Sequence, residues 1–385
     1  MTRRPKTTRA EWLARLRRLE VPGLGAFGRS SNAPYLLLLV VLLLVPFILP
    51  SLVDDGANAG VWVLLALGLN IVVGYAGLLD LGYAAFFAIG SYAFAILASG
   101  QFNIHLSFWL LLPASAFVAA VFGVLLGAPT LRLRGDYLAI VTLGFGEIVP
   151  KVVRNATPLT GGVNGIVGVD QPHLPPVPGW DGNFGFNPVP YYYLILAIII
   201  VSLFLINNLR NSRLGRAWMA IREDEVAAAA TGVNTVTTKL LAFAMGAAFS
   251  GFAGTVYASK LFVVVPESFS FQAVSVVVLV MVVLGGMGSI RGVIVGAVLI
   301  YLLQHKVLIA LPGWIASATA ALNIGFLNNA DIGGIVQRSN YLIFGIILAG
   351  IMLVRPQGLF PNTQRKVELE LGTSDEAVSD LRGSA

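Results

Sequence analysis

Long apolar runs dominate the chain, and short segments rich in polar residues, glycine and proline separate them. Most runs are continuous and about 20 residues long, which is the length of an α-helix that crosses a bilayer. A membrane β-strand would instead alternate apolar and polar residues. The pattern predicts ten spans: 34–52, 57–74, 81–99, 107–128, 136–153, 190–207, 239–260, 271–288, 291–311 and 340–354.

Basic residues in the short connections predict the orientation of these spans, because such loops stay in the cytoplasm. If the basic N-terminal tail lies inside, then 74–80, 129–136, 210–239, 289–292 and the C-terminal tail also lie inside. Most basic loops therefore share one side. Lys151 and Arg154 are the exceptions, since both fall at the outer end of the fifth span.

The two ends of the chain are polar, so we expect three regions. Residues 1–33 form a basic cytoplasmic segment, 34–358 the transmembrane domain and 359–385 a cytoplasmic tail. Apolar residues in 11–20 can share one helical face, which is typical of a helix lying on the cytoplasmic leaflet. A disordered basic tail is the alternative.

Composition agrees with an all-α polytopic membrane protein. The chain is 57% hydrophobic and 11% charged, whereas a soluble domain carries about 25% charged residues. Its net charge of +6 indicates membrane-surface contact and topology rather than nucleic-acid binding. Without cysteine there is no disulfide and no thiolate metal site.

Two longer outer segments interrupt the pattern. Residues 155–189 carry six prolines and many glycines, so they cannot form one regular element, yet they are too apolar for a simple linker. We expect an ordered cap there. Residues 312–339 form the second excursion.

The connection 210–239 does not have the sequence of a plain loop. Helix-forming residues fill its centre, and Gly232 follows at a position suited to end a helix. Trp218, Ile221 and Val226 can share one side of that helix. We predict a short charged helix to which a partner protein can bind. A solvated loop with helical propensity is the alternative. Its expected contact residues are Arg216, Trp218, Arg222, Glu223, Asp224, Glu225, Ala228 and Gly232.

Small residues at intervals of four predict where helices approach closely. Gly246, Ser250 and Gly254 form one such ridge. A second consists of Gly288, Gly292 and Gly296. We assign both to packing within the bundle.

Catalytic motifs are missing from the sequence. It has no P-loop, and its three histidines are scattered. Asp80, at the start of the third span, is interpreted as a helix cap or as part of an inner gate. Glu147, within the fifth span, either pairs with Lys151 or lines a pathway. Because these are few intramembrane charges, an external energy source is favoured over ion coupling.

Four stretches together resemble a known family. Residues 225–232 (EVAAAATG) are similar to the coupling loop of ABC importer permeases. Residues 74–92, 131–148 and 284–297 resemble the M-type permease subunits of branched-chain amino-acid ABC importers, which are related to the urea and simple-sugar permeases. The similarity covers roughly residues 35–360.

The resemblance implies an ABC importer permease in the bacterial inner membrane, with both termini cytoplasmic. It implies transport of leucine, isoleucine and valine, driven by ATP-Mg bound to partner subunits. The implied partners are an H-type permease, two ATPase subunits and a periplasmic or lipid-anchored binding protein. We expect no cofactor and no enzymatic activity on this chain itself. A urea or short-chain amide permease is the alternative; an ion-coupled carrier is a weaker one.

Overall fold

The computed structural model describes residues 33–130, 136–176 and 181–321, with a few further positions between 342 and 360. It divides into two units, residues 1–52 and 53–385. The first contains an apolar helix, α2 (Ala33–Ile48), and a short 3-10 turn, η2 (Pro50–Leu52). The predicted interfacial helix at 11–20, the polar tail after 360 and most of the tenth span lie outside the described residues. The predicted region boundaries therefore stay predictions.

The second unit is a helical bundle, as the apolar pattern predicts. Its helices are α3 (Val53–Leu69), α4 (Tyr83–Leu97), α5 (Phe108–Thr130), α6 (Asp136–Asn155), α7 (Thr157–Thr160), α8 (Pro188–Asn211), α9 (Arg213–Glu223), α10 (Glu225–Ala230), α11 (Thr235–Leu261), α12 (Val276–Gly285), α13 (Ile290–Leu302) and α14 (Leu308–Ala321). Three π-helical turns extend or connect them: η3 (Asn70–Tyr75), η6 (Phe271–Ser275) and η7 (Leu303–Val307). The described part of the unit also contains two 3-10 turns, η4 (Gly162–Asn164) and η5 (Pro266–Phe269).

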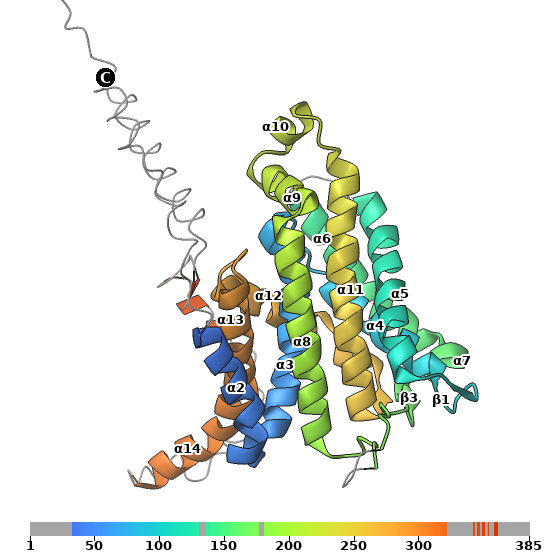
Figure 1. The fold of residues 1–385 in the computed structure, drawn as a ribbon, viewed down its shortest axis with the longest axis vertical. Helices are drawn as coiled ribbons and strands as arrows, with labels where there is room; N and C mark the ends of the chain where they lie inside the picture. The colour runs from blue at the N-terminus through green and yellow to red at the C-terminus, as the bar shows by residue number, and fades with distance from the viewer. Residues whose placement is uncertain are drawn as a thin grey trace, which may run out of the picture. The chain divides into compact units, whose positions relative to one another are not determined.

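The core lies around α3 and α11 (Figure 1). Almost every side chain of α3 from Ala57 onward is buried, so the helix is apolar on all sides rather than on one stripe. Helix α11 packs against α5, α4 and α3, while α13 packs against α12 and α3. The described part of this unit is therefore built on two central helices with the others around them.

Small residues of α11 set the distance between these helices. A Cβ atom added at Gly246 would collide with Val72, and one at Gly254 would collide with the backbone of Ser91. In lipid the hydrophobic effect does not drive helices together, so van der Waals contact between closely approaching backbones contributes to their association. The structure thus places the first predicted ridge at the contacts of α11 with η3 and α4.

The second ridge is only partly on a helix. A Cβ at Gly292 would collide with Gly285, and one at Gly296 with Met281, so these two glycines hold α13 against α12. Gly288 is different, because it precedes α13 and has a φ of +84°. The prediction that it belongs to the ridge is wrong: Ser289 caps α13 by accepting a hydrogen bond from Gly292 N, and the helix begins after that cap.

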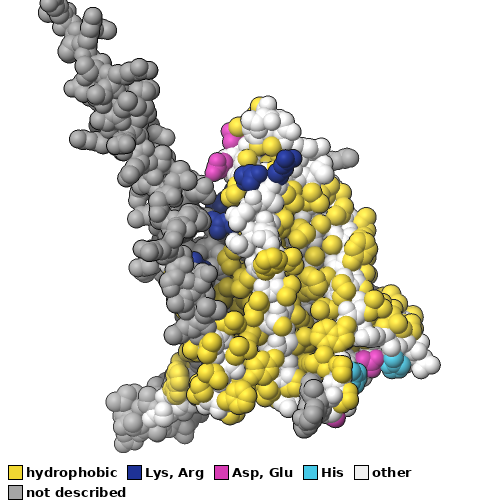
Figure 2. All heavy atoms as spheres, in the orientation of Figure 1, with side chains coloured by type: hydrophobic (Ala, Val, Ile, Leu, Met, Phe, Trp, Pro, Cys, Tyr) yellow, Lys and Arg dark blue, Asp and Glu magenta, His cyan; other side chains and the backbone are white. Residues whose placement is uncertain are grey.

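Five helical segments in the described part of the chain are long and apolar enough to cross a membrane, and three shorter apolar helices accompany them. Exposed side chains of the long helices, such as Phe117, Leu125 and Phe204, are large and hydrophobic. Figure 2 shows them covering the flank over α5, α8 and α11, with charged groups gathered near the two ends. This distribution is typical of a membrane protein.

One detail differs from the predicted spans. Helix α6 covers the fifth span, but its four charged residues leave it less apolar than the others. The ninth predicted span, 291–311, agrees with the apolar segment Ile290–Leu311, and the helix continues beyond it as α14 (Leu308–Ala321). The total of ten spans stays a prediction.

The connections gather at two opposite ends of the second unit. Helices α9 and α10 lie at one end (Figure 1). At the other end β1 (Ala98–Ser99) pairs antiparallel with β2 (Ile104–His105), and β3 (Ile166–Val167) with β4 (Val263–Val264). The segment 155–189 is divided into short elements there, as its prolines require. This grouping of the connections at two ends agrees with the alternation of inner and outer loops that the basic residues predict.

We predict that Gly254→Ala destabilises the bundle by about 1–3 kcal/mol, since an added methyl group must displace the α4 backbone. The matched control is Gly144→Ala in α6, where an added Cβ meets no atom within 4 Å. Unfolding of the purified protein in mixed micelles measures the difference. Equal stability of both variants would contradict the role given to this contact.

Candidate coupling site

The segment between α8 and α11 forms two short helices rather than the single helix predicted. Ser212 starts α9 by accepting a hydrogen bond from Gly215 N. Asp224 has extended backbone angles, and its Oδ1 accepts hydrogen bonds from Val226 N at 2.8 Å and Ala227 N at 3.0 Å. An aspartate that caps so well ends the preceding helix and begins the next one. Helix-forming residues alone could not reveal that break.

Helix α9 is anchored to the bundle by its apolar side. Trp218 is fully buried, and its Nε1 donates to Thr238 O on α11 at 2.7 Å. Ile221 is buried beside it. Val226, which was predicted to share this side, is exposed because the break at Asp224 redirects the chain.

Arg222 joins α9 to the core. Its Nη1 donates to Gly74 O in η3 at 2.6 Å. In the same π turn, Asn70 Oδ1 accepts a hydrogen bond from Gly288 N at 2.8 Å. A continuous set of contacts therefore runs from α9 through η3 to the turn between α12 and α13. The turns that contain Gly74 and Gly288 therefore meet at this point.

Glu225 is engaged within the chain. Its carboxylate lies 2.5 Å from Lys239 Nζ, and the Lys239 side chain is 8% exposed. From the sequence we expected Glu225 to present its charge to a partner protein. In the structure Glu225 instead fixes α10 to α11. Ala228 is also buried. The exposed positions of the predicted contact set are Arg216, Glu223, Asp224 and Gly232.

Gly232 reverses the chain after α10, as predicted. Its φ is +89°, and its N–H donates to Ala229 O while Val233 N donates to Ala228 O. Such a closure satisfies the last carbonyls of a helix and favours glycine. An added Cβ would meet open space, so a substitution there would strain the backbone only.

Asp80 is fully buried between η3 and α4. It does not cap α4, because Gly82 occupies the N-cap position; instead Asp80 Oδ1 accepts from Gly82 N at 2.8 Å, just before the helix. Its Oδ2 has no hydrogen-bond partner within the described residues. Burial raises the pKa of Asp80 to about 7. A role at an inner gate stays a prediction.

Glu147 and Lys151 form the predicted ion pair, with 3.3 Å between their charged atoms. Both side chains are exposed on α6. An ion pair on the lipid-facing surface of a span is costly, so this side of α6 is expected to face protein or water. A pathway role for Glu147 stays a prediction.

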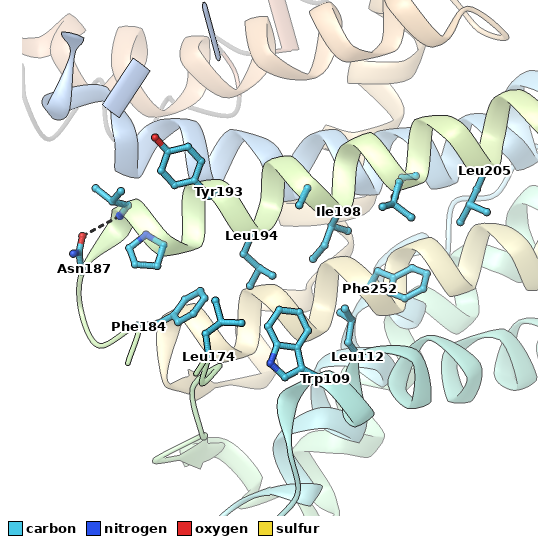
Figure 3. Close-up of a pocket in the computed structure, with 15 residues that line it drawn as sticks. Trp109, Leu112, Leu174, Phe184, Asn187, Tyr193, Leu194, Ile198, Leu205 and Phe252 are labelled. Carbon is cyan, nitrogen blue, oxygen red and sulfur yellow. Dashed lines mark hydrogen bonds between the residues drawn. The ribbon is translucent and has the colours of Figure 1, made fainter. Parts of the chain in front are cut away.

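Two cavities have no sequence signature. An apolar groove of about 720 Å³ lies beside α8 (Figure 3). A second, more polar pocket of about 530 Å³ lies between α3, α11, α12 and α13. Residues of the second pocket are scattered from Asn58 to Ile309, so no local pattern could have identified it.

Comparison with known proteins identifies the family. Residues 56–352 match the model of the branched-chain amino acid transport system permease component. The chain is 41% identical over 353 residues to the high-affinity branched-chain amino acid transport system permease protein LivM of Salmonella typhimurium, covering 87% of this chain and 76% of that one. The chain belongs to this permease family.

Another relative of the permease is LivM of Escherichia coli, which is 40% identical over 367 residues, covering 90% of this chain and 79% of that one. The ribose import permease RbsC of Haemophilus influenzae is more distant, at 24% identity over 285 residues, covering 72% of this chain and 84% of that one. No solved structure matches the permease. The resemblance derived from the sequence is thereby confirmed.

We predict that Glu225→Lys loosens α10, because it places a second positive charge against Lys239. Losing the pair costs roughly 1 kcal/mol, since one partner is partly exposed, and this corresponds to about fivefold faster amide exchange in 225–233. Hydrogen–deuterium exchange on the purified permease measures it. Glu223→Lys, an equal charge reversal at an exposed neighbouring position, is the control. Unchanged exchange in Glu225→Lys would show that the ion pair does not hold α10.

Proposed function

We propose that this permease is a transmembrane subunit of an ABC importer that carries leucine, isoleucine and valine into the cell. Support comes first from the two LivM proteins, which are 41% and 40% identical over most of the chain. The observation that carries the mechanism is the α9–α10 segment, which is held at one end of the bundle by Trp218 and Arg222. Its remaining surface is free to meet another protein.

The importer we propose has further subunits. Two ATPase subunits bind ATP-Mg, an H-type permease completes the membrane part, and a periplasmic or lipid-anchored binding protein delivers the substrate. The chain itself then needs no cofactor and no catalytic group. We place the complex in the bacterial inner membrane, with both termini and α9–α10 in the cytoplasm, in accord with the basic loops.

Motion in the ATPases must reach the membrane helices through a rigid contact. We infer that α9–α10 receives it, and that Arg222 passes it to η3. Supporting this, Arg222 bonds the carbonyl of Gly74, and Asn70 of the same turn bonds Gly288. A displacement of α9 would therefore pull on α3 and on the turn between α12 and α13 together.

Helix α6 supplies the proposed contact with the second permease. Its exposed face carries Glu147 and Lys151 among apolar residues such as Ile140 and Ile148. We propose that this face lines the path between the two permeases, with Glu147 facing the substrate. The cost of an ion pair in lipid supports this orientation.

The test of the function is co-purification followed by reconstitution. Gentle solubilisation should recover an ATPase and a second permease with this chain. Proteoliposomes that contain the complex, its binding protein and ATP should accumulate radiolabelled leucine, and unlabelled isoleucine and valine should compete. Uptake driven by an ion gradient without ATP would overturn the proposed ABC importer. Uptake of urea in place of leucine would overturn the proposed substrate.

We predict that Arg222→Ala uncouples ATP use from uptake. Loss of a charge-assisted hydrogen bond costs about 1.5–3 kcal/mol, so ATP consumed per leucine imported should rise about tenfold or more. The control is Arg213→Ala, which removes an exposed arginine from the same helix. Hydrolysis and uptake are measured together in the reconstituted complex. A normal ratio in Arg222→Ala would exclude the bond to Gly74 as the link.

A further inference from the structure

The polar pocket between α3, α11, α12 and α13 lies far from the coupling site along α3. Asn58 and Trp62, near the start of that helix, line the pocket, whereas Arg222 contacts the turn after its last residue. Given the orientation proposed above, the pocket lies toward the outside. With about 530 Å³, it has room for a small molecule with several ordered waters.

Two of the π turns form part of its wall. Gln304 and His305 come from η7, and Ala273 comes from η6. A π turn inserts one residue into a helix, costs backbone stability and is frequent at functional sites. The His305 ring stacks on Tyr301 with 4.4 Å between centroids, so the turn holds this side chain in a defined position. Both interruptions therefore shape the same cavity.

The lining has one apolar and one polar part. Val61, Leu65 and Val277 contribute aliphatic surface. Asn58, Ser268 and Gln304 contribute hydrogen-bonding groups. A free amino acid with an aliphatic side chain also has one polar and one apolar part. Its ammonium and carboxylate groups carry the charges, and its side chain is uncharged.

Two ion pairs lie next to residues that line the polar part, but their four charged residues are not themselves part of the lining. Lys260 Nζ lies 2.7 Å from Asp54 Oδ1 and donates to Asn58 Oδ1 at 2.6 Å. Lys306 Nζ lies 2.7 Å from Asp55 Oδ2. Each pair is neutral as a whole, so neither adds a net charge beside the pocket. A cationic or anionic amino acid would bring one uncompensated charge into the pocket.

The larger groove beside α8 lacks this chemistry. Figure 3 shows aliphatic and aromatic side chains along it, including Leu194, Ile198 and Phe252. It has few polar groups, and two of them are engaged within the chain, since Trp109 Nε1 donates to His173 O and Asn187 Oδ1 accepts from Val189 N. A zwitterion there would lose its hydration without replacement. The two cavities thus differ in the ligands that they can hold.

We propose that the polar pocket is a substrate subsite within this single chain, which binds a neutral zwitterionic amino acid with an aliphatic side chain. Its identity as leucine, isoleucine or valine rests on the proposed function. The aliphatic side chain packs on α3 and α12, while the ammonium and carboxylate groups face Asn58 and Gln304. The permease then selects its substrate in addition to conducting it.

The test uses the complete permease–ATPase complex in nanodiscs, without the binding protein. Equilibrium binding of tritiated leucine should be saturable. Ala273→Trp, which fills the pocket, should weaken binding at least tenfold. The matched control is Ala197→Trp in the apolar groove, where binding should be unchanged.

A smaller substitution tests the same pocket in case Ala273→Trp prevents correct assembly of the complex. Gln304→Ala should weaken leucine binding about tenfold through loss of a hydrogen bond to a charged group. Isobutylamine and isovalerate, which are valine without its carboxylate and without its ammonium group, should compete poorly with leucine. Leucine import by the same complex, with binding protein and ATP added, is measured in parallel.

The outcomes separate the two proposals. Failure of the wild-type complex to import leucine refutes the proposed function. Normal import without saturable binding, or with wild-type binding in both Ala273→Trp and Gln304→Ala, refutes only the subsite. Equal competition by isobutylamine or isovalerate would also overturn it, because the pocket would then recognise the hydrocarbon part alone.

Discussion

Every backbone N–H and C=O group in a membrane helix needs a partner inside the protein, because lipid supplies none. A regular α-helix meets this requirement by itself, so each interruption creates groups that side chains must satisfy. The interruptions in this permease are satisfied in that way. Arg222 donates to the carbonyl of Gly74, Asn70 accepts from Gly288 N, and the hydroxyl of Ser275 accepts from Ala84 N. The contacts that we propose for coupling are among these few polar bonds.

The same constraint explains why coupling and substrate binding are assigned to different ends of one helix. Helix α3 is buried along most of its length and continues into η3. Its last turn exchanges hydrogen bonds with α9 and with the turn before α13, while its first turns line the polar pocket. A buried helix held by close packing moves as one body. Under the two proposals above, α3 would be the mechanical route between the α9–α10 contact and the pocket.

Close packing by small residues makes this arrangement possible. Gly246 and Gly254 let α11 lie against η3 and α4, and Gly292 and Gly296 let α13 lie against α12. Larger side chains would separate the backbones and break the short polar bonds between the elements. The glycines thus set the distances between the helices.

The sequence by itself determined the helical class, the position of most helices and the family, because continuous apolar runs and glycine-rich turns are local features that lipid and backbone geometry enforce. It also located the α9–α10 segment, the reversal at Gly232 and the Glu147–Lys151 pair, which all depend on neighbours a few residues apart. Only the tertiary structure decided what Asp224, Glu225 and Asp80 do. Asp224 could extend a helix or cap one, and its bonds to Val226 N and Ala227 N show that it caps α10. Glu225 could face a partner or Lys239, and packing against α11 made that choice. The polar pocket was beyond local patterns for the same reason: its wall joins α3, α11, α12 and the π turns only when the bundle is assembled.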